Sequence, residues 1–366
     1  MIFAEPLKKV APNPIIDAVK TTTPSPQQRV LDRTRDAFAQ LTQPFHQEIK
    51  LHCYRMLGSS HEAEDLVQET YLRAWRNFDR YTEDGSLRAW LYQIATNACL
   101  NALAQRKQVG RLLPDQHAPS TEQMPNGIPA NDVLWLEPYS DSNLDGISDG
   151  AANPETRYAM SEAVQLAFVA AIQQLPPRQR AVLLLCDVLG WSAAETAALL
   201  DGSIASINSA LQRARATLTR HYPDGPPAAV APPDPAQQEL LRRYLRAWEG
   251  LELDDFVALL KEDAIYTMPP MAQWYAGRRA IRGFFAHAFR GYSAFRMLPI
   301  AANRQHAFAA YSRSAAGNTW TAHSIHVLTL ECDRVSALTL FVKPRGPDLF
   351  RDFGLPLTLT DTANAP

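Results

Sequence analysis

The pattern of apolar and polar positions over residues 59–107 predicts two consecutive amphipathic helices. In the first, which ends near residue 78, apolar side chains recur every three or four positions and therefore share one buried face. Ser59 and Glu62 stand three residues apart at its start, the spacing of a capping box. The opposite face is polar, and we regard it as a candidate binding surface: Asp65, Gln68, Glu69 and Arg76.

The second helix follows a turn at Gly85, with Ser86 as its N-cap. Besides an apolar seam, it has a row of aromatic and amide side chains that ends in basic residues: Trp90, Gln93, Asn97, Asn101, Arg106 and Lys107. An aromatic ring can stack on an unpaired base, amides can contact base edges, and basic groups can bind phosphates. A single amide on a helix is usually only solvated, but this row favours binding to a single strand of nucleic acid.

The segments DLVQETYLRAW and GSLRAWLYQIATNACLNAL resemble region 2 of bacterial sigma factors, in particular those of the extracytoplasmic-function group. The resemblance covers residues 37–107 and extends over both helices. It implies that the first helix binds the clamp helices of the largest subunit of core RNA polymerase. It also implies that residues 81–86 and the second helix capture the melted non-template strand of the minus-ten promoter element.

Residues 155–222 predict a second helical domain, which contains a helix-turn-helix. One helix stops at LPP, and Pro177 can begin the next. Ser192 and Glu195 then form a capping box, and Ser203 caps a long last helix with Ile204 in its apolar seam. Small and polar residues near the start of that helix allow close approach to base edges, and arginines farther along suit phosphates. The candidate DNA contacts are Ser203, Ala205, Ser206, Ser209, Gln212 and Arg213.

Many small helical domains contain a similar arrangement, so the wider sequence matters here. LPPRQRAVLLL, GWSAAETAALL and NSALQRARATL together resemble region 4 of sigma factors. This resemblance implies that the second domain reads the minus-thirty-five promoter element. Two matching regions in the correct order predict a sigma factor, with core RNA polymerase and promoter DNA as its partners.

Residues 113–154 join the two helical domains and read as an acidic, flexible linker. They are rich in Pro, Gly, Asn and Ser and contain no Lys or Arg. Trp135, Leu136 and Tyr139 interrupt the polar run, which indicates a short stretch that is bound to something. If the chain is a sigma factor, this linker is expected to pass through the basic channels of the polymerase.

A Pro-rich spacer at 223–235 precedes a domain at 236–345, with helices followed by strands, and a tail at 346–366. This order, with the segments DAIYTMPP and GRRAI, resembles the α+β cone of the SnoaL-like, nuclear-transport-factor-two-like fold. The resemblance implies that the domain modulates sigma activity in cis. The candidate lining of a ligand pocket is Tyr266, Met268, Trp274, Phe285, Trp320 and Phe341.

Relatives with this fold include isomerases and cyclases, which need a carboxylate or histidine base in an apolar cavity. His323 and His326 lie on one predicted strand, but their odd spacing predicts side chains on opposite faces. Asp263 is as compatible with a turn as with a base. Structural packing is therefore the first interpretation, a small-molecule sensor pocket the second and catalysis the third. We expect no catalytic residue, metal or cofactor.

Composition describes an ordinary globular protein of 366 residues with a formal charge of −2, so any contact with nucleic acid must come from local patches. The four cysteines form no C-x-x-C pair, which is typical of buried thiols in a reducing compartment. The sequence shows neither a signal-peptide core nor a membrane span, and residues 1–33 read as a disordered tail. These features predict a cytoplasmic protein.

The sequence as a whole predicts a multidomain fold. Two all-α sigma domains, at 34–112 and 155–222, are followed by an α+β SnoaL-like domain. The predicted function is that of a non-enzymatic sigma factor, which directs RNA polymerase to specific promoters. The rival hypothesis is a helix-turn-helix regulator fused to an isomerase-like or cyclase-like enzyme. The polar face around Asp65 and Glu69 distinguishes the two, because a stand-alone regulator has no evident use for it.

Overall fold

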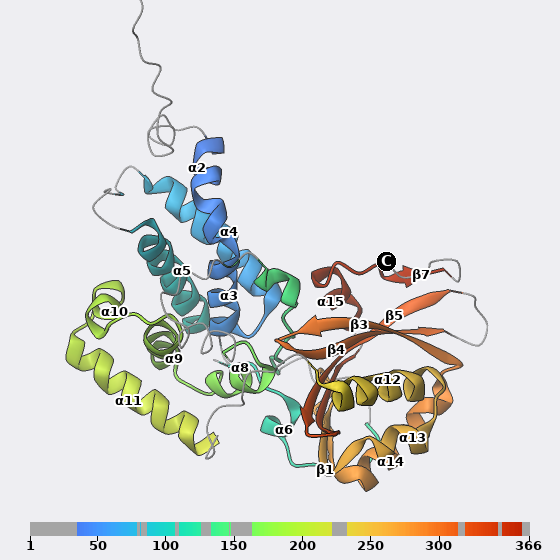
Figure 1. Cartoon of the computed structure of the whole chain (residues 1–366). Helices are drawn as coiled ribbons and strands as arrows, with labels where there is room; N and C mark the ends of the chain where they lie inside the picture. Colours follow the sequence, from blue (N-terminus) through green and yellow to red (C-terminus); the bar gives the residue numbers. More distant parts are fainter. Residues whose placement is uncertain are drawn as a thin grey trace, which may run out of the picture. The chain divides into compact units, whose positions relative to one another are not determined.

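The computed structural model describes residues 35–78, 81, 86–106, 110–125, 133–145, 147, 163–221, 233–313, 319–342 and 346–360 (Figure 1). The predicted disordered tail at 1–33, the turn at 82–85, Lys107 and most of the Pro-rich spacer lie outside these residues. The chain divides into a unit at 1–43 and a unit at 44–366. In the first, the described helix is α2 (Arg35–Thr42). The second contains everything discussed below.

Three helices form the first predicted domain: α3 (His46–Leu57), α4 (Ser60–Arg76) and α5 (Leu87–Ala104). Each packs against the other two. The predicted cap of α4 is confirmed, since the backbone N–H of Glu62 donates to Ser59 Oγ at 3.2 Å. Helix α3 is the most enclosed of the three, and even its Tyr54 and Arg55 are buried. It therefore forms the centre of this domain.

The second helical domain contains the predicted helix-turn-helix. Its elements are α8 (Leu166–Ile172), α9 (Pro177–Leu183) with a π-helical turn η4 (Leu184–Val188), α10 (Ala193–Leu199) and α11 (Ile204–His221). Ser192 and Glu195 form the predicted capping box at the start of α10. Asp201 turns the chain into α11 with a φ of 48°, a left-handed conformation that Asp tolerates better than most residues. Helix α11 packs on α9 and α10 through its buried side.

The C-terminal domain is an α+β fold, as predicted. Its helices are α12 (Pro235–Glu249), α13 (Leu253–Ala258) and α14 (Gly277–Ala288). Its strands are β1 (Leu260–Thr267), β2 (Trp274–Ala276), β3 (Ala294–Ala302), β4 (Gln305–Arg313), β5 (Trp320–Glu331), β6 (Arg334–Phe341) and β7 (Thr358–Leu359). The sheet is open, with strand order β2-β1-β6-β5-β4-β3, and β7 pairs with β5. Helices α12–α14 cover one side of it (Figure 1), where aromatic side chains make up much of the core.

The segment predicted to be a C-terminal tail is folded as far as residue 360, so the prediction of a tail from 346 was wrong. It forms α15 (Gly346–Asp352), which packs on β5, and then β7. The Phe350 ring is fully buried, and Tyr311 Oη donates to Pro356 O at 2.8 Å. Burial of Phe350 and Leu349 and the pairing of β7 with β5 together hold this extension on the sheet.

The linker is also more ordered than predicted. It contains a short helix α6 (Pro114–His117) and a 3₁₀ turn η3 (Asp141–Leu144). Trp135, Leu136 and Tyr139 are buried, so the prediction that this stretch is bound was correct and its partner is the same chain. The prediction of flexibility was wrong for residues 133–145, because their apolar side chains are buried in the folded chain.

None of the helices in the described ranges combines the length and the apolar character that a bilayer span requires. Cys53 and Cys99 are buried, Cys186 is partly buried and Cys332 is exposed, and all four are free thiols. The prediction of buried thiols is therefore confirmed for two of the four.

Candidate nucleic-acid and protein interfaces

The predicted polar face of α4 is accessible. Asp65, Gln68 and Arg76 are exposed, and Glu69 is partly exposed and bonded to Arg73 at 2.7 Å. Leu72 lies on the same face at helical spacing and is 52% exposed. Leu72 was not among the predicted residues, although its position four residues after Gln68 and four before Arg76 was a signal for it in the sequence. A large apolar side chain among charged ones suits a protein partner better than water.

The aromatic end of α5 belongs to a cluster of three rings. Trp90 lies 6.2 Å from Phe78 and 5.3 Å from Tyr81 between ring centroids. The described part of the predicted 81–86 loop is thereby attached to the start of α5. Along the helix, Gln93 and Asn97 are partly buried and Asn101 is exposed. These residues lie in order on one helix, which is the arrangement predicted for a single-strand contact.

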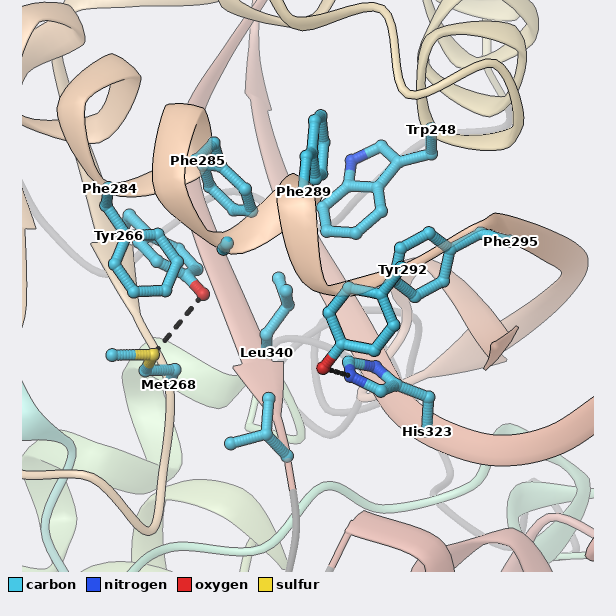
Figure 2. A pocket seen from close by; sticks show the side chains of 12 residues that line it. Trp248, Tyr266, Met268, Phe284, Phe285, Phe289, Tyr292, Phe295, His323 and Leu340 are labelled. Carbon is cyan, nitrogen blue, oxygen red and sulfur yellow. Dashed lines mark hydrogen bonds between the residues drawn. The ribbon is translucent and has the colours of Figure 1, made fainter. Parts of the chain in front are cut away.

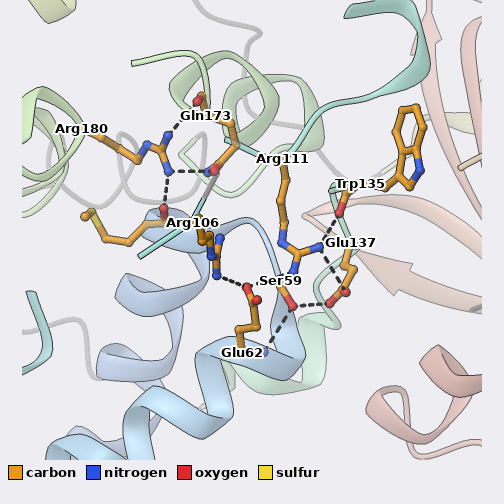
Figure 3. A network of polar contacts seen from close by, with 9 residues as sticks. Ser59, Glu62, Arg106, Arg111, Trp135, Glu137, Gln173 and Arg180 are labelled. Atoms are coloured by element: carbon orange, nitrogen blue, oxygen red, sulfur yellow. Dashed lines mark hydrogen bonds and ion pairs between the residues drawn. The ribbon is translucent and has the colours of Figure 1, made fainter. Parts of the chain in front are cut away.

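Arg106, predicted to bind a phosphate, has a protein partner in this structure. Its guanidinium donates to Glu62 at the start of α4, and its side chain is only 15% exposed. Glu62 also pairs with Arg111 at 3.0 Å, and Arg111 lies 3.7 Å from Glu137 of the linker. Ser59 Oγ closes the network by donating to Glu137 at 2.6 Å (Figure 3). We call these five residues the Glu62 network. It joins α4, the end of α5 and the linker.

The six candidate contacts on and before α11 are all exposed. Ser203 caps the helix by accepting from Ser206 N at 3.1 Å, and Ser206 Oγ donates back to Ser203 O at 2.7 Å. Ile204, predicted in the buried seam, is 51% exposed, so that prediction was wrong. It stands in the first turn, before the helix reaches its core, which begins at Ile207. An exposed apolar residue there can contact a thymine methyl group.

A cavity of about 240 Å³ lies between α14 and the sheet of the C-terminal domain (Figure 2). Of the six predicted lining residues, Tyr266, Met268 and Phe285 line it. The other lining residues are Trp248, Phe284, Ala288, Phe289, Tyr292, Phe295, His323, Leu340 and Val342. Several of them lie on α14 or just after it, and others lie on strands β3, β5 and β6. Which strands pack against α14 could not be predicted from spacing within one segment.

The other three predicted lining residues lie elsewhere, which corrects the prediction. The Trp274 indole N–H donates to Ala118 O of the linker at 2.6 Å. Trp320 packs under the guanidinium of Arg313, with 4.8 Å between the cation and the ring centroid. Phe341 is buried, and its carbonyl lies against Gly346 at the start of α15. Alternation along a strand gives the face of a residue but not its partner.

His323 and His326 were predicted to face opposite sides, and this prediction was also wrong. The register of β5 against β4 shifts at His323, so the strand has a bulge that interrupts strict alternation. Ser324 Oγ consequently lies 2.8 Å from both His323 Nδ1 and His326 Nε2. Burial places the pKa of His326 well below its usual value, so the ring is neutral. Within the described ranges, no group of His, Cys, Asp and Glu could bind a metal ion.

Asn303, in the turn between β3 and β4, forms hydrogen bonds with both helical domains and with the linker. Asn303 exchanges two hydrogen bonds with Tyr139: its N–H donates to Tyr139 O, and its Oδ1 accepts from Tyr139 N, each at 2.8 Å. Its Nδ2 donates to Tyr54 Oη at 2.9 Å and to Val164 O at 2.8 Å. We call these contacts the Asn303 clasp. Asn303 is fully buried and has a φ of 56°, which Asn adopts more readily than most residues.

The linker meets the C-terminal domain at a second place, along β2. Thr121 N donates to Trp274 O at 2.9 Å, and Tyr275 Oη donates to Gln123 O at 2.8 Å. Together with the bond from Trp274 to Ala118, these contacts run beside residues 118–123. The C-terminal domain thus binds the linker at two separate segments.

Comparison with known proteins matches each domain to a described family. Residues 41–109 match Sigma-70 region 2, residues 165–218 match Sigma-70 region 4, and residues 241–338 match the SnoaL-like domain. The ECF RNA polymerase sigma factor SigG of Mycobacterium tuberculosis is 43% identical over 331 residues, which are 90% of this chain and 86% of SigG. The ECF RNA polymerase sigma factor SigW of Bacillus subtilis is 29% identical over 52% of this chain and 91% of its own.

Among solved structures, the crystal structure of the Mycobacterium tuberculosis extracytoplasmic function sigma factor SigJ is similar in fold. It has a TM-score of 0.54 and 23% identity and covers 85% of this chain and 96% of its own. The predicted resemblances are therefore confirmed, and a regulator fused to an enzyme does not account for the match to region 2. This chain belongs to the extracytoplasmic-function family of sigma factors, which direct RNA polymerase to specific promoters for transcription initiation.

Proposed function

We propose that this sigma factor binds the clamp helices of the largest RNA polymerase subunit through the exposed face of α4. The observation that supports this is Leu72, half exposed between charged residues of a helix whose opposite face is fully used in packing. The contact surface consists of Asp65, Gln68, Glu69, Leu72 and Arg76. Charged residues at its edge orient the partner, and the central leucine excludes water on binding.

We assign the promoter contacts to two other surfaces, one on α5 and one at the start of α11. The row Trp90, Gln93, Asn97 and Asn101 binds the melted minus-ten strand, together with Arg106 and Lys107. The exposed residues at the start of α11 enter the major groove of the minus-thirty-five element, with Ile204 added to the predicted set. Arg213 lies farther along and contacts a phosphate.

The C-terminal domain regulates these activities in cis, and its role is structural rather than enzymatic. Two observations support inhibition as the direction. The Asn303 clasp connects α3, the linker and the segment before α8, so the two promoter-binding domains are not free to separate. The Glu62 network pairs Arg106, one of the residues proposed to bind DNA, and it is linked to the clasp because Tyr54 Oη donates to Glu137 O at 2.9 Å. The described residues that line the cavity include no carboxylate, and both ring nitrogens of its histidine, His323, are bonded within the protein, to Ser324 and Tyr292.

Polymerase binding is tested by pull-down of core enzyme with the full chain. Reversing two charges in Asp65→Lys/Glu69→Lys is expected to abolish capture, while reversal of Asp254 and Asp255, exposed on α13, leaves it intact. Equal capture of core enzyme by the two double variants would show that this face of α4 does not bind polymerase.

Regulation in cis is tested by run-off transcription with purified core enzyme. Asn303→Ala is expected to raise transcription several-fold, because it removes the side-chain bonds of the clasp. Arg304→Ala is the matched control, since Arg304 occupies the same turn with an exposed side chain. Unchanged or lower transcription by a folded Asn303→Ala chain contradicts inhibition by the clasp.

A further inference from the structure

The cavity of the C-terminal domain opens to solvent and reaches into the aromatic core. Its volume of about 240 Å³ equals roughly eight water molecules at ~30 Å³ each, enough for a compact ligand of about ten non-hydrogen atoms. Protein interiors are normally packed as densely as organic crystals, because an empty space forfeits dispersion contacts. The surrounding side chains are mostly aromatic and aliphatic. Tyr292 and His323 bring polar groups to one end, and the Tyr266 hydroxyl, which donates to Met268 Sδ at 3.5 Å, lies on the other side (Figure 2). Such a space suits a flat apolar molecule.

Charge limits the class of ligand further. Among the described lining residues there is neither an acidic side chain nor a Lys or Arg. A charged ligand would lose its hydration here without gaining a counter-ion, which is strongly unfavourable. The ligand is therefore uncharged.

The polar end of the cavity is connected to a chain of hydrogen bonds through the core. Tyr292 Oη lies 2.8 Å from His323 Nε2, and His323 Nδ1 lies 2.8 Å from Ser324 Oγ. Ser324 Oγ is 2.8 Å from His326 Nε2, and His326 Nδ1 is 2.8 Å from Tyr244 Oη. We call this chain the Tyr292 relay. A neutral imidazole donates through one nitrogen and accepts through the other. Ser324 is fully buried, and its own proton is paired when it donates to one ring and accepts from the other, so we take the protons of the relay to point in one direction.

The direction is set at the buried end. Tyr244 is fully buried, and its hydroxyl lies 2.8 Å from His326 Nδ1, which can accept its proton. Tyr244 therefore donates to His326 Nδ1, because this arrangement keeps its buried proton paired. The reverse direction would strand the Tyr244 proton in an apolar core.

The direction of the hydrogen bonds along the relay determines whether Tyr292, at the cavity end, donates or accepts. His326 Nε2–H donates to Ser324 Oγ, the Ser324 hydroxyl donates to His323 Nδ1, and His323 Nε2–H donates to Tyr292 Oη. The oxygen of Tyr292 accepts, so its hydroxyl proton is available to the cavity. Each ring then uses one nitrogen as a donor and the other as an acceptor.

From this geometry we propose that the cavity binds an uncharged, flat, largely apolar molecule of one or two rings through a single acceptor oxygen. Tyr292 donates to that oxygen, and the relay fixes Tyr292 as a donor. A ketone, aldehyde or ether oxygen fits this description, whereas a hydrocarbon of the same size leaves the Tyr292 proton unpaired. This site is independent of whether the Asn303 clasp inhibits transcription.

A matched pair of probes tests the proposal with the full chain. 1-Tetralone and tetralin share a bicyclic skeleton, and only the ketone carries an acceptor. Binding is measured by titration calorimetry and by the fluorescence of Trp248, with Trp248→Phe identifying its signal. We expect 1-tetralone to bind at least tenfold more tightly than tetralin. Failure of both probes to bind, or equal affinity for the two, overturns the proposal.

Two variants locate the site and the donor. Tyr292→Phe keeps the ring and removes the hydroxyl, so it is expected to weaken 1-tetralone about tenfold and leave tetralin unchanged. Ala288→Leu, which fills part of the cavity, is expected to weaken both probes. Circular dichroism confirms that each variant is folded, and if either proves unfolded, the comparison of the two probes on the unmodified chain still decides the proposal. Retention of the wild-type preference in folded Tyr292→Phe refutes the assignment of the donor.

Discussion

Asn303 and Tyr139 are joined by two reciprocal hydrogen bonds of 2.8 Å, although 164 residues separate them in the sequence. The first uses the backbone N–H of Asn303, and the second uses its side-chain oxygen. The turn between β3 and β4 thus pairs with the linker much as two neighbouring strands pair. Ser140 and Ala302 extend this pairing by an isolated antiparallel bridge. The linker is therefore attached to the sheet through backbone pairing as well as through burial of Tyr139.

Replacement of Asn303 is expected to release the linker locally. Asn303→Gly and Asn303→Ala both remove the side-chain bonds, and a buried group left unpaired costs about 1–3 kcal/mol. Alanine also has to adopt the left-handed φ of 56°, so it should be about 1 kcal/mol less stable than glycine. Hydrogen exchange of the Tyr139 amide provides the measurement. We expect at least tenfold faster exchange in both variants, with alanine the faster. Wild-type protection in either variant speaks against the clasp.

Leu72 is expected to contribute to polymerase affinity without contributing to the fold. Leu72→Ser removes an apolar side chain that is 52% exposed in the free chain, so thermal stability should change by less than about 0.5 kcal/mol. If the Leu72 side chain becomes buried on binding, the variant should lose about 1–2 kcal/mol of binding free energy, which raises the Kd for core enzyme roughly tenfold. Titration of labelled core enzyme measures this. Arg243→Ser on α12 is the control, and equal affinities would exclude Leu72 from the interface.

The start of α11 allows sequence readout to be separated from phosphate binding. Arg213→Ala should weaken holoenzyme binding to all promoters similarly and reduce the slope of log K against log salt by about one. Arg213→Lys preserves the charge and should retain most of the affinity. Ile204→Ser should instead lower affinity for some minus-thirty-five sequences more than for others. Binding to a library of promoter variants at two salt concentrations distinguishes them. A uniform effect of Ile204→Ser would place that residue outside the groove.

Acid stability should depend on His52. Burial is the main cause that lowers the pKa of His52 to about 3, and the ring bonds to Thr96 at 2.9 Å. Between pH 6.5 and 3 the unfolded chain binds a proton at His52 that the folded chain does not, so stability falls as pH falls. The expected slope is about 1.4 kcal/mol per pH unit. His52→Gln can keep the bond to Thr96 and should lose about 2 kcal/mol less between pH 6.5 and 5. Urea unfolding at both pH values is the measurement, and identical losses would contradict the assignment.

Local signals in the sequence predicted local structure well. The predicted capping box forms at Ser192–Glu195, because it depends on residues three positions apart. At Ser59–Glu62 only the bond from Glu62 N to Ser59 Oγ forms, because the Glu62 carboxylate pairs with two arginines. The face of α4 and the exposure of α11 follow from helical spacing in the same way. The family resemblances extended this success to the order of domains and to the function. The assignment of individual contact residues remains a prediction.

Long-range partners were not predictable from spacing. Trp274 was assigned to the cavity, but its indole N–H bonds to Ala118, 156 residues away. Arg106 was assigned to DNA, but a carboxylate on the preceding helix accepts from it. One bulge in β5 reversed the expected face of His323 relative to His326. In each case the outcome depends on how separate segments meet, and periodicity within one segment contains no information about that.

The buried guanidinium of Arg180 bears on how the two halves of the sigma factor could come apart. It donates to Met56 O on the first half and to Ile172 O, Gln173 O, Gln173 Oε1 and Leu175 O on its own half. Of the bonds made by Arg180, only the one to Met56 would break if the halves moved apart, and the cation would keep its other four acceptors. Arg55, on the first half, is placed differently, because its Nε donates to Ala163 O of the second half at 3.1 Å. Separation would therefore cost more at Arg55 than at Arg180.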